Sequence, residues 1–278
     1  MIRIVTDTGS DIPYLGAAAL GVESLELGIN FEEFPYDYRE DTDFSQFFEL
    51  LAKSKTLPTT SQVTPGQYLD IFEDAEKKGD KVVVITMSSG ISGTYSSAEM
   101  AREMSGYEGI WLVDSHQCCL TQRLLVEYAI KLRDQGKGAE EIAAELLALR
   151  ERLGFLVLLD TLTYLRKGGR VPPAMAILGE MLNMKPAVTM RGGKVVPLSK
   201  ARGTEAGKRV LWAQVEADGV DENWPVYFGY SQNREWGTTF MEETKAKFGF
   251  KDCRLVGVGG VIGTHAGPNG IGIGYVKK

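Results

Sequence analysis

Short apolar runs that alternate with helical patterns are the feature that most constrains the fold of this 278-residue chain. Three such runs lie at residues 2–6, 81–87 and 110–113. Runs of this length that are apolar almost throughout are typical of parallel strands buried on both faces. Because helical patterns lie between them, the first half of the chain predicts a parallel sheet flanked by helices.

Three segments of the first half have the apolar spacing of amphipathic helices. Residues 65–78 follow Thr64, which is a suitable N-cap, and begin with Pro65 at the first helical position. Residues 121–135 and 139–153 each place apolar side chains on one face. We therefore expect helices over these three segments.

The second half of the chain has a different pattern, in which a β-hairpin stands among strands and helices. Its two strands are expected at residues 186–190 and 194–198, joined by the turn Arg191-Gly192-Gly193. The other elements expected here are strands at residues 155–159, 226–230 and 254–258, and helices at residues 174–182, after Gly203 and up to Phe248. This pattern predicts an α/β protein of two domains, residues 1–153 with a parallel sheet and residues 154–278 with a mixed or antiparallel sheet and helices.

Composition and charge exclude several classes of protein. The formal net charge is −6, from 37 acidic and 31 basic residues, whereas a surface that binds nucleic acid or anionic membrane usually carries the opposite sign. The N-terminus has no basic region followed by an apolar run, and no stretch approaches the roughly 18 apolar residues of a membrane span. We therefore expect a soluble, cytoplasmic protein with no nucleic-acid partner and no integral membrane segment.

Common catalytic and metal-binding motifs are missing from the sequence. Cys118, Cys119 and Cys253 fit neither a disulfide framework nor a tetrahedral metal site, and they indicate reduced thiols. There is no G-x-x-x-x-G-K-S/T loop, no H-E-x-x-H and no G-x-S-x-G elbow. We therefore expect no P-loop nucleotide site and no metal site, and the missing elbow weighs against an α/β-hydrolase.

The loops that follow the three predicted strands of the first half are small and polar. In open α/β sheets, ligands bind beyond the carboxyl ends of the strands. Residues 88–94 hold four hydroxyl side chains and two glycines, directly before a helix expected to start near Thr94 or Tyr95. Glycine permits close approach of the backbone, and a helix start offers N–H groups and partial positive charge. The loop predicts a site for a carboxylate or a phosphate, with simple helix capping as an equal alternative.

The segment of residues 257–274 contains eight glycines and His265, one of only two histidines in the chain. A histidine on a glycine-rich turn after a strand is expected to be partly accessible, with neutral and charged forms both available near pH 7. An ordinary surface or core histidine is the alternative, and the density of glycine favours a functional role.

Two further signals are weaker. Residues 58–65 (P-T-T-S-Q-V-T-P) by themselves indicate the capped start of a helix. The second weak signal is a set of basic residues near glycines, which are usually solvated: Lys167, Arg170, Lys185 and Arg202. Only their convergence on one anion would indicate a binding site.

A serine-type hydrolase acting on acyl esters is the alternative function that these residues leave open. Ser92 and His265 could form a catalytic pair on an unfamiliar fold, with Asp7 or Asp114 as the orienting acid.

Together, the motifs resemble those of the DegV family over almost the whole chain. The resemblance is carried by residues 5–11 (V-T-D-T-G-S-D), 60–62 (T-S-Q), 88–95 (S-S-G-I-S-G-T-Y), 114–115 (D-S), 165–170 (L-R-K-G-G-R), 185–186 (K-P), 201–202 (A-R) and 263–267 (G-T-H-A-G). Each motif is weak alone, whereas their order and spacing together are highly specific.

The resemblance implies two α/β domains with a lipid pocket between them and within the C-terminal domain. DegV-like proteins bind a fatty acid, and the best-understood members resemble the acyl-binding subunit of bacterial fatty acid kinase. In that system a separate ATP-binding kinase subunit phosphorylates the bound fatty acid to acyl phosphate. The resemblance therefore implies a non-catalytic protein that binds one long-chain fatty acid in an apolar tunnel, presents its carboxylate to a kinase subunit, and needs no cofactor.

The same resemblance implies which residues form the site. Thr60, Ser92 and His265 would bind the carboxylate, and Ser61 and Gly93 would be further ligand-binding residues. The sequence does not show which residues line the pocket for the acyl tail. The apolar face of the expected helix at residues 174–182 could line it, although ordinary core is the preferred interpretation.

Arg170 and Arg202 would lie near the head-group opening and face the phosphate or the kinase subunit. The chain departs from the family pattern at Val63 and Gly260, where proline is usual, and at Asn269, where glycine is usual. None of these departures removes a proposed polar contact; they bear on loop stiffness and on kinase partnering.

Overall fold

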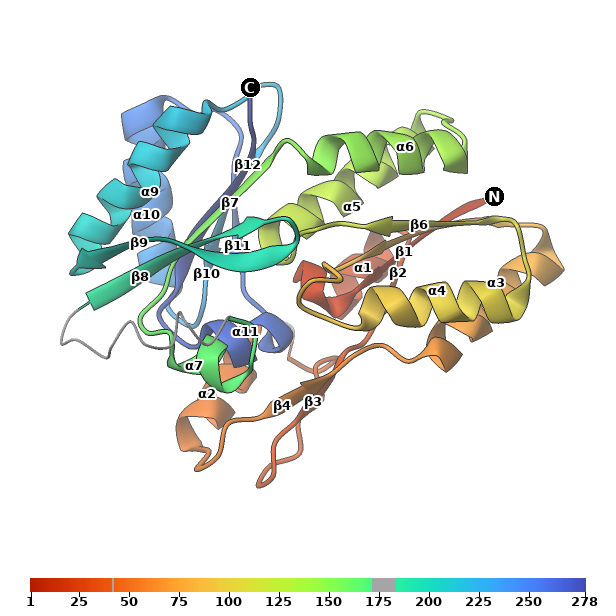
Figure 1. Cartoon of the computed structure of the whole chain (residues 1–278), viewed down its shortest axis with the longest axis horizontal. Helices are drawn as coiled ribbons and strands as arrows, with labels where there is room; N and C mark the ends of the chain where they lie inside the picture. Colours follow the sequence, from red (N-terminus) through yellow and green to blue (C-terminus); the bar gives the residue numbers. More distant parts are fainter. Residues whose placement is uncertain (42, 172–183) are drawn as a thin grey trace.

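The computed structural model describes residues 1–41, 43–171 and 184–278, whose elements form two α/β halves (Figure 1). The expected helix at residues 174–182, with its apolar face, lies outside the described residues. The first half contains β1 (Ile2–Asp7), the 3₁₀ turn η1 (Thr8–Ser10), α1 (Tyr14–Ala19), β2 (Val22–Leu25), β3 (Gly28–Asn30), α2 (Ser45–Lys53), β4 (Thr59–Ser61), α3 (Pro65–Lys78), β5 (Lys81–Thr86), α4 (Thr94–Ser105), β6 (Ile110–Asp114), α5 (Cys119–Asp134) and α6 (Ala139–Arg150). The second half contains β7 (Leu153–Leu158), α7 (Thr163–Lys167), β8 (Met184–Arg191), β9 (Lys194–Arg202), α9 (Thr204–Asp218), β10 (Val226–Tyr230), α10 (Arg234–Phe248), β11 (Cys253–Gly257), α11 (Gly260–Ala266) and β12 (Ile271–Val276).

The first half is built on a parallel sheet, as the sequence predicted, and the strand β2 joins the three predicted strands β1, β5 and β6 at one edge. Its strand order is β2-β1-β5-β6, and each neighbouring pair is parallel. The helices α3 and α4 pack together on one side of this sheet, and α5 and α6 lie on the other (Figure 1). The side chains of Val82, Val83, Val84 and Ile85 on β5 are completely buried, because both faces are covered.

The predicted helix signals of the first half are confirmed at their starts more often than at their ends. Thr64 caps α3 in a capping box with Gln67, whose backbone N–H lies 3.4 Å from Thr64 Oγ1. The helix predicted at residues 139–153 begins where expected but ends earlier. It is α6, which ends at Arg150, and Leu153 already belongs to β7. An apolar residue at this position fits the helical spacing and the strand equally well.

The second half is built on a six-stranded mixed sheet of order β11-β10-β12-β7-β8-β9. Only β10 and β11 pair in parallel, and the other neighbours are antiparallel, which confirms the predicted mixed sheet. The predicted hairpin is β8 and β9. Gly192 and Gly193 have φ of 54° and 74°, and two consecutive positive φ values favour glycine at a hairpin turn.

A central strand, β12, was missed by the sequence analysis. Residues 257–274 were expected to form a glycine-rich turn, but they divide into the end of β11, the helix α11 and most of β12. β12 pairs antiparallel with β7 on one side and β10 on the other. Because glycine is depleted in strands, its alternation at residues 270, 272 and 274 concealed the strand.

The glycines of this sheet let a helix of the first half pack directly on its backbone. A Cβ atom at Gly274 would lie 3.0 Å from Leu120 Cβ and 3.0 Å from Thr121 Cγ2, both on α5. A Cβ at Gly229 would lie 3.1 Å from both methyl carbons of Leu120. The two halves thereby share one hydrophobic core, which extends from Ile4 in the first half to Val276 in the second.

A second core lies on the other face of the mixed sheet, under α9 and α10 (Figure 1). It contains Leu156 and Leu158 from β7, together with Leu211 of α9 and Phe240 of α10. The predicted domain boundary between residues 153 and 154 falls inside β7. None of the described helices is long and apolar enough to cross a membrane.

Candidate functional site

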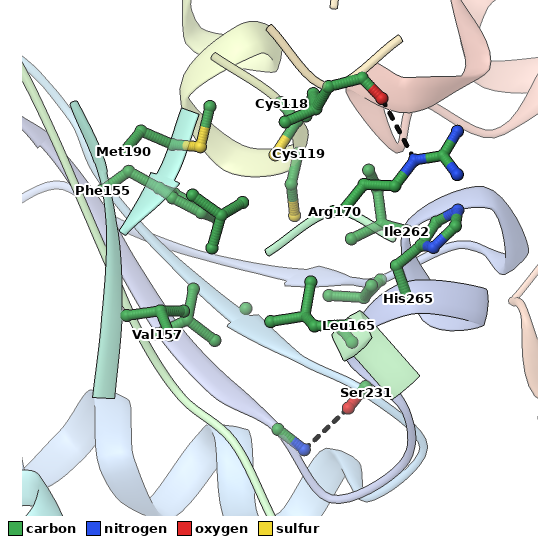
Figure 2. A pocket seen from close by; sticks show the side chains of 18 of the residues that line it. Cys118, Cys119, Phe155, Val157, Leu165, Arg170, Met190, Ser231, Ile262 and His265 are labelled. Atoms are coloured by element: carbon green, nitrogen blue, oxygen red, sulfur yellow. Dashed lines mark hydrogen bonds between the residues drawn. The ribbon is translucent and has the colours of Figure 1, made fainter. Parts of the chain in front are cut away.

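A cavity lies between the two halves of the molecule, against the face of the mixed sheet that α9 and α10 do not cover (Figure 2). It holds about 930 Å³ of space between atoms, including open solvent at its mouth. Its lining is mainly apolar and comes from both halves of the molecule, which suits an apolar ligand with a few polar contacts.

Alternate residues of β7 build one wall of the cavity. Phe155, Val157 and the following Leu159 line it, whereas Leu156 and Leu158 belong to the core on the opposite face. This is the two-residue period of a strand with both faces covered. The sequence analysis missed these lining residues, because an unbroken apolar run does not tell which face borders a core and which borders a cavity.

The cavity has an apolar end and a polar end. Figure 2 shows Met190, Phe155 and Val157 on one side, whereas Arg170 and His265 lie together on the other. Val188 and Val195 from β8 and β9 also line the cavity, as do the buried thiols Cys118 and Cys119. Thr60 and Ser92 complete the lining residues that the sequence analysis had singled out.

A hydrogen bond between the two halves marks the polar end. Thr60 Oγ1 on β4 lies 2.9 Å from His265 Nε2 in the last turn of α11, across 205 positions of sequence. The structure thus brings together a hydroxyl and an imidazole that the sequence analysis identified as separate candidates. A ring nitrogen and a hydroxyl can each be donor or acceptor here, depending on the tautomer.

Ser92 has two roles in its loop. Its Oγ accepts a hydrogen bond from the backbone N–H of Thr94, the first residue of α4, at 3.2 Å and lies 2.9 Å from Thr94 Oγ1. The same side chain borders the cavity. Ser92 therefore satisfies a backbone N–H at the start of α4 and also contributes to the lining of the cavity.

Gly93 and Ser61 lie beside the cavity rather than among its lining residues. A Cβ at Gly93 would lie 2.0 Å from Gln62 Oε1, so a larger residue there would have to displace the Gln62 side chain. The Gln62 amide donates to Ser97 Oγ at 2.7 Å, which fixes the segment after β4 against α4 and holds Thr60 near Ser92. Ser61 is exposed on β4.

The two arginines that the sequence analysis grouped together have different positions. Arg170 lines the cavity, and its Nε donates to the carbonyl of Ile91 at 3.2 Å, as Figure 2 shows. Its Nη1 donates to the carbonyl of Gly168 at 2.6 Å. Arg202 is exposed at the end of β9, opposite Met184, and is not among the lining residues of the cavity.

The expected ionisation of His265 was wrong. Burial, together with the nearby positive charge of Arg170, lowers the pKa of His265 to about 4, so the ring is neutral at pH 7. The ring packs against Gly168, where a Cβ would lie 2.2 Å from Nδ1. Nδ1 is buried and has no hydrogen-bond partner among the described residues. The sequence suggested a partly accessible residue on a turn; His265 is half-buried, as expected, but it lies in the last turn of the helix α11.

The hydrogen bonds do not arrange these residues as a hydrolytic triad. Ser92 bonds to Thr94 and His265 bonds to Thr60. The Asp7 carboxylate accepts from the backbone of Gly9 and Met87 and from Gln122, and Asp114 accepts from Ser89 and from the backbone of His116. In the part of the chain that the structure describes, no hydrogen bond joins Ser92, His265 and either acid.

Comparison with known proteins supports the resemblance seen in the sequence. The model of the DegV family, described as "Uncharacterised protein, DegV family", matches residues 1–278. A solved DegV family protein from Thermus thermophilus, described by its fatty acid binding, is 28% identical with a TM-score of 0.88, and the match covers 100% of this chain and 99% of that chain.

Two further solved structures are similar over the same extent. DegV from Bacillus subtilis, described as a fatty acid binding protein, is 31% identical with a TM-score of 0.83. A protein from Eubacterium ventriosum described as binding stearic acid is 26% identical with a TM-score of 0.88. Each match covers 100% of this chain and 99% of the other. The family model and these structures span the whole of the present sequence, and this chain belongs to the DegV family.

Proposed function

We propose that this protein binds one long-chain fatty acid in the cavity, with the acyl tail along the apolar wall and the carboxylate at the polar end. The Thr60–His265 hydrogen bond at one end of a mainly apolar cavity is the observation that carries the proposal. The solved relatives described as fatty acid-binding proteins support it.

The apolar wall suits an aliphatic tail. Each buried methylene contributes about 0.8 kcal/mol, so a typical long chain gains roughly 10 kcal/mol before the cost of association is subtracted. Val157, Val188 and Met190 offer dispersion contacts without any fixed direction. The wall therefore binds longer acyl tails more tightly, and it discriminates little between head groups.

The polar end suits a carboxylate, which must not be buried without partners. A neutral imidazole carries one N–H. With this proton on Nε2, His265 donates to Thr60 Oγ1, and the Thr60 hydroxyl is free to donate its own proton to the carboxylate. We assign this tautomer because it turns the pair into a donor toward the anion. Ser92 and the charge of Arg170 then complete the carboxylate site.

We further propose that the protein presents this carboxylate to a separate kinase subunit and does not itself transfer phosphate. The family resemblance supports this step. Arg170 supplies positive charge at the polar end, and the exposed Arg202 at the end of β9 is free to face a partner. Ser61 and Gly93 support the site by shaping the segments that hold Thr60 and Ser92.

Native mass spectrometry of protein purified from a bacterial host tests the binding proposal. We expect the added mass of one long-chain fatty acid, released by denaturing extraction. Apo protein that takes up neither oleate nor stearate would overturn the proposal. A fluorophosphonate probe provides a separate test, since labelling of Ser92 that depends on His265 would favour the hydrolase instead.

The kinase step has its own experiment. Loaded protein is mixed with ATP and a candidate kinase subunit, and acyl phosphate is trapped with hydroxylamine. Formation only in the presence of both proteins supports the proposal, and His265→Ala should impair it. Acyl phosphate formed by this chain alone would contradict the non-catalytic role.

A further inference from the structure

A buried carboxyl of the first half holds the start of the helix that carries His265. Asp11 follows η1, and its Oδ1 accepts a hydrogen bond from the backbone N–H of Gly259 at 2.9 Å. Gly259 is the N-cap residue of α11 and lies 248 positions away in the sequence. A Cβ at Gly259 would lie 2.9 Å from this same Oδ1, so any larger residue there would push against the carboxyl group.

Asp11 is itself held in place from several directions. Its backbone has a φ of 51°, in the left-handed region, and its carbonyl accepts from Arg123 Nη1 at 3.2 Å. The Cys119 thiol at the start of α5 lies close to its carboxyl group and lowers the pKa of that group. Three elements, η1, α5 and α11, therefore meet at one residue.

The charges around Asp11 explain its ionisation. Burial raises the pKa of Asp11 to about 7, with a further small increase from Asp7. The Cys119 thiol, the Gly259 N–H and the charge of Arg123 oppose this increase. The side chain retains a hydrogen-bond acceptor for Gly259 in either protonation state.

α11 transmits this contact to the polar end of the cavity. At about 1.5 Å per residue, the helix separates Gly259 from His265 by roughly 9 Å. Its flank packs closely, because Cβ atoms at Gly260 and Gly263 would each lie 2.7 Å from ring carbons of Phe47. The helix is thus held at its start by Asp11, along its side by Phe47, and at its end by the Thr60–His265 hydrogen bond.

We propose that Asp11 is a positioning residue of the carboxylate site, which holds the start of α11 and thereby keeps His265 aligned with Thr60. Its importance for ligand binding rests on the proposed function. The position of His265, however, can be measured without any lipid, so the two ideas can fail separately.

Two substitutions isolate the carboxyl group from the backbone conformation. Glycine and asparagine both tolerate the left-handed φ of Asp11. Asp11→Asn keeps an oxygen that accepts from Gly259, whereas Asp11→Gly removes it. Gly259→Ala disturbs the same contact from the other side, and it replaces Asp11→Gly should that variant fail to fold. Asp7→Asn is the matched control, since Asp7 is a buried acid whose hydrogen bonds do not reach α11.

The first readout is the titration of the histidine rings by NMR, which is simple to assign because the chain has only His116 and His265. We expect Asp11→Gly and Gly259→Ala to raise the pKa of His265 toward the ordinary value of about 6.5, as the ring loses its packed position. Asp11→Asn, Asp7→Asn and the His116 ring in every variant should remain unchanged. A His265 pKa that stays low in folded Asp11→Gly would overturn the proposal.

The second readout compares the binding of oleate with that of oleyl alcohol. We expect Asp11→Gly to weaken oleate binding by about tenfold while leaving the alcohol within about twofold, because only the acid needs the aligned head-group contacts. Asp11→Asn should restore oleate binding. An equal loss for both ligands would indicate a merely structural role and contradict the proposal. If the wild-type protein binds neither ligand, the proposed function fails, and the NMR titration still decides the role of Asp11.

Discussion

The two ends of the cavity are built in different ways. The apolar end is formed largely by neighbouring strands of one sheet, with Phe155 and Val157 from β7 and Val188 and Met190 from β8. The polar end is assembled from segments of both halves, namely β4, the loop after β5, the segment after α7, and α11. A sheet provides a continuous surface, whereas the polar end depends on several separate contacts remaining aligned.

This difference suggests that the two ends contribute differently to ligand binding. Apolar contacts are individually small and add up with the length of the ligand. Hydrogen bonds are few, directional, and costly to leave unmade. We therefore expect the apolar end to set the strength of binding and the polar end to set which head group is accepted.

Shortening the ligand should have the largest effect of all. Octanoate lacks ten of the methylenes of stearate, which corresponds to about 8 kcal/mol of gross apolar transfer. We expect octanoate to fail as a competitor against a bound fluorescent long-chain fatty acid at concentrations where stearate displaces it fully. Comparable displacement by the two acids would break the comparison, because the head group alone would then account for binding.

The ionisation of His265 should make the stability of the polar end depend on pH. The pKa of His265 is about 4 in the folded protein and about 6.5 in an unfolded chain. Between these values the unfolded state binds the proton and the folded state does not, so the contribution of His265 is full above pH 6.5 and is lost as the pH falls toward 4. The loss amounts to at most about 3 kcal/mol.

Two buried acids act in the opposite direction, so the measurement must isolate His265. The pKa values of Asp7 and Asp11 are raised to about 6 and about 7, and their contributions to stability increase as the pH falls through the same window. Urea unfolding of the wild type and of His265→Gln at pH 7 and pH 4.5 separates the contribution of His265 from those of the two acids, because both proteins contain the acids. The wild type should lose about 2 to 3 kcal/mol more than the variant, and parallel losses would contradict a neutral buried ring.

The sequence predicted β1, β5 and β6 because these strands are apolar almost throughout, but it did not predict the edge strand β2, whose V-E-S-L segment is only partly buried. It missed β12, since glycines at residues 272 and 274 are unusual in a strand and Gly274 serves the close approach of Leu120. It identified Thr60, Ser92 and His265 as candidates, but their convergence depends on contacts between residues more than 200 positions apart. It also could not separate Arg170 from Arg202, because both follow the same local pattern and only the fold brings Arg170 to the cavity.

Thr60→Val should produce a moderate and selective loss at the polar end. The substitution keeps the shape of the side chain and removes the hydroxyl, which leaves both His265 Nε2 and the carboxylate without this partner. We expect oleate binding to weaken by about 1.5 to 3 kcal/mol, with little change for oleyl alcohol. Titration calorimetry with both ligands checks this. An equal loss for acid and alcohol would show that Thr60 belongs to the wall and not to the head-group site.

Gly274→Ala should have the smallest effect, and it tests whether the apolar end depends on the close approach of α5. The added methyl group would lie 3.0 Å from Leu120 Cβ and from Thr121 Cγ2, so α5 must move by a few tenths of an ångström. We expect a loss of about 1 to 2 kcal/mol in the free energy of unfolding, as for modest overpacking. Gly138→Ala is the control, because its Cβ would meet nothing within 4 Å and its φ of −71° suits alanine. Because Leu120 lines the cavity, the movement of α5 should also alter the affinity for stearate while leaving the difference between acid and alcohol unchanged. A change in that difference would mean that the two ends are coupled through α5, and that the division between them is less complete than the geometry suggests.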